Sequence, residues 1–130
     1  MTSMAAPWTP DERNTVEGAI KRHPAESGEC AALARVIFKV GQTRDETTRG
    51  RQVRPAETLR ARWIIPKHPA VRAWASHTFV ETHKHAVDAL AGADGCDPAR
   101  YLQEHFRYAE SLDIVDVDVD TVDPGIEDDR

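Results

Sequence analysis

The segment AWASHTFVETHKHAVDAL, residues 73–90, constrains the fold most, because apolar and β-branched residues stand on both sides of a polar centre. This pattern favours a β-hairpin. With a two-residue turn at Thr82 and His83, His77 comes directly opposite Asp88, and opposite residues share a face of the sheet with Cβ atoms about 5 Å apart. We therefore expect the His77 imidazole to contact the Asp88 carboxylate. A four-residue turn would make the pair diagonal and still within reach.

Two amphipathic helices are predicted before the hairpin. Thr9, Pro10 and Glu12 form a capping box that begins the first helix, and Pro24 ends it soon after Arg22. Ser27 is expected to cap the second helix, which a left-handed glycine ends. Its apolar stripe recurs at helical spacing and is predicted to face the core: Cys30, Leu33, Ala34, Ile37 and Gly41.

The rest of the chain gives weaker signals. Residues 42–56 are polar, rich in arginine and without period, which predicts a loop, and residues 58–65 favour a strand that Pro66 ends. A third helix is predicted from Asp97 and Pro98 to near Ser111, and the alternation IVDVDVDTVD at 114–123 predicts a half-buried strand. We expect an α+β fold in one domain of residues 1–130, with a core over 9–122 and an acidic tail at 123–130. The expected order is α, α, loop, β, β, β, α, β.

Bulk composition excludes several classes. The chain has 130 residues, a net charge of -5 and two cysteines, too few for a disulfide framework. No stretch approaches the roughly 20 apolar residues that span a bilayer, and the N-terminus lacks the pattern of an export signal. We expect a cytoplasmic protein with no membrane partner, no metal and no cofactor.

Charge is unevenly distributed along the sequence. Residues 42–72 hold eight Lys or Arg and three acids, a net of +5, whereas residues 110–130 hold nine acids and one Arg, a net of -8. The two segments could attract each other across the fold, mark separate binding faces, or simply form solvated surfaces of opposite sign. We favour separate solvated surfaces.

Cys30 is the candidate nucleophile. A cysteine reacts as thiolate, and a helix N-terminus lowers its pKa through unsatisfied amides and the positive end of the dipole. Gly28 would allow a substrate backbone to approach, and the Cys30 amide could bind an oxyanion. Taken alone, Cys30 is better explained as a small buried core residue. The hairpin changes this, because it supplies His77 as base and Asp88 as the group that orients it.

Three motifs carry a family resemblance: GEC at a helix start, SHTFVE on a strand and HAVDAL on the next strand. Their order resembles the papain-like and transglutaminase-like thiol enzymes, and most of all the bacterial papain-fold toxin domains. The lasso-peptide leader peptidases are also similar. The resemblance spans about residues 12–110. It implies a Cys30–His77–Asp88 triad, with the cysteine helix packed on a small antiparallel sheet.

The resemblance implies chemistry at an amide carbonyl, as in a peptidase, a glutamine deamidase or an acyltransferase. It also implies a protein or peptide substrate and an immunity or regulatory protein as partner. One departure concerns the oxyanion site: papain has a glutamine shortly before its nucleophile, where this chain reads HPAESGE. Gln42, Gln52 or a backbone amide would replace it. The alternative is an inactive papain-like binding module.

Other interpretations compete for the same residues. Trp63 and Trp74 flank the candidate site and could line a substrate groove, although core aromatic residues are the more common case. An uninterrupted strand would place four zinc-ligand candidates on one face, with Cys96 nearby: His77, Glu81, His83 and His85. We expect a solvated hairpin tip instead.

Two further patterns are discounted. Four acids have the spacing of a calcium loop, Asp116, Asp118, Asp120 and Glu127, but Thr121 stands where the sharp turn needs glycine. The arginines of the expected loop have no stacking aromatic among them, so nucleic acid is not the expected partner: Arg44, Arg49, Arg51 and Arg54.

Overall fold

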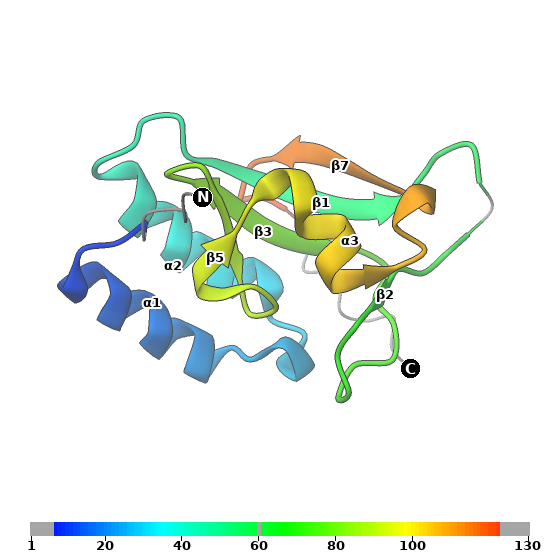
Figure 1. Ribbon diagram of the computed structural model, residues 1–130, viewed down its shortest axis with the longest axis horizontal. Coiled ribbons are helices and arrows are strands. Elements are labelled where there is room, and N and C mark those ends of the chain that lie inside the picture. Colours follow the sequence, from blue (N-terminus) through cyan, green and yellow to red (C-terminus); the bar gives the residue numbers. More distant parts are fainter. Residues whose placement is uncertain (1–6, 60, 123–130) are drawn as a thin grey trace, which may run out of the picture.

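The computed structural model describes residues 7–59 and 61–122 as an α+β fold, with helices packed on an antiparallel sheet (Figure 1). The α-helices are α1 (Pro10–Arg22), α2 (Cys30–Gln42) and α3 (Tyr101–His105). The main sheet contains β1 (Arg49–Pro55), β3 (His77–Thr82), β4 (His85–Asp88), β5 (Gly92–Cys96) and β7 (Leu112–Val117). The expected fold class and the antiparallel sheet under the cysteine helix are confirmed.

β1 lies inside this sheet, whose strand order is β5-β4-β3-β1-β7. The prediction of a loop over residues 42–56 was therefore wrong for its second half. β1 combines charged and buried positions: Arg51 pairs with Asp116 of β7 at 3.1 Å, while Gln52 and Val53 are buried. The preference for separate charged surfaces was wrong here, because the basic and acidic segments attract each other between neighbouring strands.

The N-terminal helices follow local sequence signals. Thr9 and Glu12 form the predicted capping box, and α1 ends at Arg22. Ser27 does not cap α2, because it belongs to a short 3-10 helix (Ala25–Ser27) and α2 begins at Cys30. Gly41 does not end α2 in the left-handed region; it lies inside the helix, where a Cβ would come 2.5 Å from the Thr82 Oγ1 atom. Close packing explains this glycine.

The sheet separates two apolar clusters. On one face Val16 of α1 and Ile37 of α2 pack with Val80 and Val87 of the hairpin. On the other face, Tyr101 of α3 belongs to a cluster with residues of β1, of β3, of the segment before β3 and of the segment after α3: Val53, Phe79, Trp74 and Phe106. Figure 1 shows α1 and α2 side by side, away from α3, so the hairpin contributes to both clusters.

The connecting regions are less regular than expected. The predicted strand over residues 58–65 reduces to β2 (Ile65–Pro66), which pairs with β6 (Phe106–Arg107). The third helix ends at His105 rather than near Ser111, because Phe106 turns into β6. It begins through a 3-10 turn (Pro98–Arg100) that Asp97 caps, and a second such turn (Ala109–Ser111) precedes β7. The strand predicted over 114–123 is β7, which begins two residues earlier, at Leu112, and ends at Val117; residue 123 lies outside the described residues.

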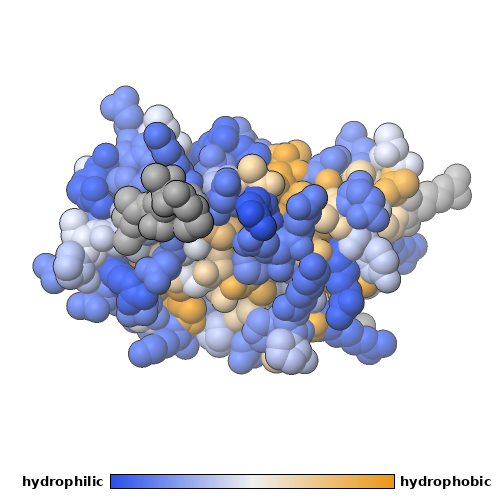
Figure 2. Space-filling view, in the orientation of Figure 1, coloured by the Kyte–Doolittle hydropathy of each residue, from blue (hydrophilic) through white to orange (hydrophobic). Residues whose placement is uncertain are grey.

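Polar side chains cover most of the visible surface, with small apolar patches between them (Figure 2). Within the described residues, none of the helices is long and apolar enough to span a bilayer.

Candidate active site

The hairpin places His77 and Asp88 on the same face of the sheet, with a register that differs from the predicted one. The turn lies at His83 and Lys84, both with positive φ, so that Thr82 pairs with His85. The expectation that His77 and Asp88 stand directly opposite was wrong by one residue on each strand. They are diagonal neighbours, and an imidazole bridges that separation.

The predicted contact between His77 and Asp88 is confirmed. The His77 Nε2 atom lies 2.7 Å from Asp88 Oδ2, and both side chains are 2% exposed. Trp74 stacks on the His77 ring, with the ring centroids 4.5 Å apart and the planes 8° from parallel. The imidazole is thus fixed in position and direction by one carboxylate and one indole.

Asp88 is bonded through both carboxylate oxygens. Oδ2 also accepts a hydrogen bond from the Tyr101 hydroxyl, and Oδ1 accepts from the amides of Leu90 and Ala91 at 3.0 and 2.7 Å. Burial by itself raises the pKa of Asp88, but these bonds and the charge of His77 outweigh it, so that its pKa lies below the usual value. Asp88 is therefore a carboxylate held in a single orientation.

Cys30 approaches His77 from the first turn of α2. The Thr78 amide, next to His77, donates a hydrogen bond to Cys30 Sγ at 3.4 Å. His77 Nε2 bonds to Asp88, which leaves Nδ1 as the ring nitrogen on the side of the thiol. Nδ1 is buried, and Cys30 and His77 are close enough to shift each other's pKa.

These shifts have opposite signs. Burial raises the pKa of the Cys30 thiol, but hydrogen bonding to His77 and the charge of His77 outweigh burial, and the net pKa is lowered. Burial lowers the pKa of His77, but hydrogen bonds to Asp88 and Cys30 raise it to about 9. Both shifts favour a thiolate beside an imidazolium, which is the reactive form of a cysteine nucleophile.

The N-terminus of α2 also favours negative charge on the Cys30 sulfur. No side chain caps this helix, because the Glu29 carboxylate bonds to His23 instead, at 3.0 Å. The amides of Ala31 and Ala32 therefore lack both an intrahelical acceptor and a capping side chain. Gly28, two residues before the nucleophile, has φ 72, a conformation that favours glycine. Negative charge on Cys30 is stabilised at this helix end.

Neither glutamine is placed as the papain resemblance would require. Gln42 is the exposed last residue of α2, at the opposite end of the helix from Cys30. Gln52 is buried, with its Nε2 atom 3.5 Å from the Thr78 hydroxyl and its carbonyl accepting from Arg54 at 2.5 Å. An oxyanion on this site would depend on main-chain amides at the start of α2.

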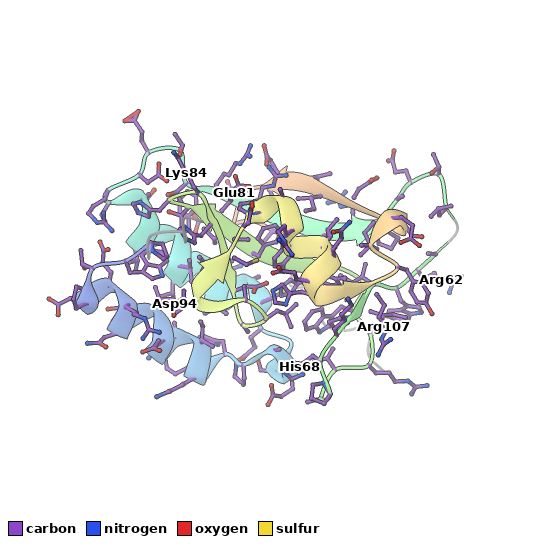
Figure 3. All side chains as sticks on the ribbon, viewed as in Figure 1. Arg62, His68, Glu81, Lys84, Asp94 and Arg107 are labelled. Carbon is purple, nitrogen blue, oxygen red and sulfur yellow. The ribbon has the colours of Figure 1, made fainter. Side chains whose placement is uncertain are left out.

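The two tryptophans have different surroundings. Trp74 is buried against His77, so it supports the base rather than lining an open groove. Trp63 is 42% exposed and lines a pocket of about 310 Å³ with Tyr108 and Leu112, which contains no triad residue. In Figure 3 Arg62 and Arg107, which line the same pocket, lie far from the hairpin turn marked by Glu81 and Lys84. Ile64, next to Trp63, is bridged to Trp74, so Trp63 is close in the chain to the site but lines a pocket that the triad does not share.

The structure does not bring together the residues that the zinc and calcium interpretations require. The turn at His83 breaks the strand that would have aligned the zinc candidates, and the His85 ring donates from Nδ1 to the carbonyl oxygen of His83 at 2.6 Å. Asp116 lies in β7 and pairs with Arg51, while Glu127 lies outside the described residues. Arg44, one of the arginines considered for nucleic-acid binding, donates a hydrogen bond to the Glu12 carboxylate at 2.6 Å.

Tyr101 and the Thr78 amide are the site groups that sequence reasoning missed. Tyr101 falls within the predicted third helix, and a tyrosine that such a helix buries needs a partner for its hydroxyl. That requirement was the available signal. A main-chain donor such as Thr78 carries no signal in the sequence.

Neither family models, nor curated proteins, nor solved structures match this chain.

Proposed function

We propose that the protein is a thiol enzyme that acts at an amide carbonyl, with Cys30 as nucleophile, His77 as proton carrier and Asp88 as the group that orients His77. The observation that carries the proposal is the continuous line of contacts from Asp88 through His77 to Cys30. A core cysteine would need neither a buried charge pair beside it nor a lowered pKa. Burying the charged pair of His77 and Asp88 costs free energy, and such buried pairs with shifted pKa values occur often at catalytic sites.

The reaction follows from the ionisation states. The Cys30 thiolate adds to the carbonyl carbon, and the oxyanion is stabilised by amides at the start of α2. The His77 imidazolium then gives its proton to the leaving nitrogen as the C–N bond breaks, which leaves an acyl thioester on Cys30. Neutral His77 takes a proton from water or an amine, which attacks the thioester and releases the acid or a new amide.

The chain order Cys, His, Asp and a cysteine helix packed on an antiparallel sheet support the resemblance to papain-like enzymes. The substrate that fits this resemblance is a protein or peptide, with peptide cleavage, glutamine deamidation and acyl transfer sharing the same intermediate. An immunity or regulatory protein that covers Cys30 is the corresponding partner.

The test is a search for products that depend on Cys30. The purified protein is incubated with a mixed library of unfolded proteins and peptides, with and without a primary amine. Mass spectrometry then reports cleaved peptides, glutamine converted to glutamate, or amine incorporated. We expect one of these three products with the native chain and none with Cys30→Ala.

Two variants sharpen the result. Asp88→Asn preserves the shape of the side chain but removes its charge, and it should lower the rate without changing the product. Cys96→Ser, assayed beside the native chain in metal-free buffer, changes the second cysteine and should leave the rate unaltered. If no Cys30-dependent product forms, or if Cys30→Ala retains the activity, the proposed function is wrong.

A further inference from the structure

A second group of reactive side chains lies between β5 and α3. Cys96 ends β5, and Glu104 and His105 are the last two residues of α3. The Cys96 sulfur, a Glu104 carboxylate oxygen and a His105 ring nitrogen all lie within 4.8 Å of one another. The strand-turn-helix connection through Asp97 brings together three different ligand types.

These ligand atoms are available. Among the described residues, neither the Cys96 thiol nor the His105 ring makes a hydrogen bond to protein; the ring contact of His105 is with Tyr101, at 5.4 Å between centroids. The Glu104 carboxylate pairs with Arg100 at 3.3 Å, and both side chains are well exposed. Such a surface ion pair is worth little and does not prevent Glu104 from rotating.

The charge around Cys96 favours a cation. Cys96 is partly buried, and the carboxylates of Glu104, Asp88 and Asp97 lie near enough to act on its sulfur. The same carboxylates that disfavour a lone thiolate would stabilise a divalent cation bound to it. A metal that displaces the thiol proton therefore meets a negative environment.

We propose that Cys96, Glu104 and His105 form a zinc site, with a fourth position open to water. Sulfur and nitrogen donors with one carboxylate suit zinc rather than magnesium or calcium. Ligand atoms around a tetrahedral zinc lie roughly 3.5 Å apart. The site would close by small rotations of Glu104 and His105.

The position of the site suggests its effect. Zinc would join the end of β5 to α3, a helix of five residues. The same helix carries Tyr101, whose hydroxyl bonds to Asp88. Bound metal would therefore stabilise the support of the His77–Asp88 pair, and this inference stands without the proposed catalytic activity.

The test uses cobalt(II) as a spectroscopic probe for zinc. The chain has two cysteines, so Cys30→Ala leaves Cys96 as its sole thiol. Cobalt added to tag-free Cys30→Ala should give a thiolate charge-transfer band that saturates at one equivalent and that zinc abolishes. Glu104→Gln and His105→Gln should weaken binding by roughly tenfold or more. Arg100→Gln, which removes the ion pair and no ligand, should bind as the parent does.

Zinc should also raise the melting temperature of Cys30→Ala but not that of the Cys30→Ala/Cys96→Ser double variant. Two results would overturn the proposal. One is the absence of the charge-transfer band in Cys30→Ala. The other is a band in Cys96→Ser as strong as in the native chain, which would place the metal on Cys30 and His77 instead.

Discussion

Tyr101 and His77 donate to the same oxygen of Asp88. The Tyr101 hydroxyl and the His77 Nε2 atom both bond to Oδ2, while the amides of Leu90 and Ala91 bond to Oδ1. The carboxylate therefore has four donors and no freedom to rotate. Because Oδ2 accepts from Nε2, the remaining nitrogen of His77 is directed to the thiol, which is the arrangement that a catalytic imidazole needs.

Tyr101→Phe removes one of these four donors with little change in volume. Burial and the nearby Asp88 charge raise the pKa of Tyr101 well above its usual value, so the hydroxyl remains a donor over the whole working range. We expect the variant to lose about 1–3 kcal/mol of unfolding free energy, the range for a hydrogen bond to a charged group. Urea unfolding at neutral pH measures this. Tyr108→Phe, at a position 64% exposed, should change nothing; equal effects at both positions would contradict the role of the Tyr101 bond.

The ionisation of His77 sets the alkaline limit of the reactive pair. Its pKa is raised from 6.5 to about 9, so the imidazolium is present below that pH and is lost as the pH rises through it. On the acid side the pair is lost when the Cys30 thiolate takes up a proton, below the usual thiol range. Activity should therefore follow a bell-shaped pH profile.

Cys30→Ala removes the neighbouring negative charge and should lower the pKa of His77. Asp88→Asn, which removes the other charge, should also lower it. Histidine ring shifts followed by NMR against pH report this titration. A pKa of His77 that is unchanged in both variants would contradict the coupling of the three side chains.

Gly41 and Gly18 provide a matched pair for the packing of α2 on the hairpin. A Cβ at Gly41 would meet Thr82 Oγ1 at 2.5 Å and Thr48 Oγ1 at 3.2 Å, whereas one at Gly18 of α1 meets only the flexible Arg22 side chain at 3.5 Å. Gly41→Ala should destabilise the fold by about 1–3 kcal/mol through overpacking. Gly18→Ala should stabilise it by about 0.5–1 kcal/mol through helix propensity. Thermal unfolding of both variants checks this, and two changes of the same sign would contradict it.

Local signals in the sequence predict much of this fold. The capping box of Thr9 and Glu12, the start of a helix near Cys30 and the hairpin each depend on neighbours in the chain. The His77–Asp88 contact could be predicted despite a wrong turn, because side chains alternate with period two and a shift of one residue on both strands keeps them on one face.

The interior strand β1 could not be predicted in the same way. Arg49 and Arg51 are charged residues of the kind that predicts a loop. In the sheet they pair with Glu81 of β3 and Asp116 of β7. That pairing joins segments more than 30 residues apart, so the evidence lies in the opposite charges of the two segments rather than in either one. Tyr101 is similar, because its hydroxyl bonds to Asp88 of β4, and this contact depends on how α3 lies against the sheet.

The most direct measurement compares Cys30 with Cys96 in one molecule. Both thiols are partly buried, but the pKa of Cys30 is lowered while that of Cys96 is raised to about 12. The protein is treated with limiting iodoacetamide at mildly acidic pH, and peptide mass spectrometry follows each cysteine in time. We predict that Cys30 reacts roughly tenfold or more faster than Cys96 and than free cysteine, and that His77→Gln removes this advantage. A Cys30 that reacts no faster than free cysteine would contradict its assignment as the nucleophile.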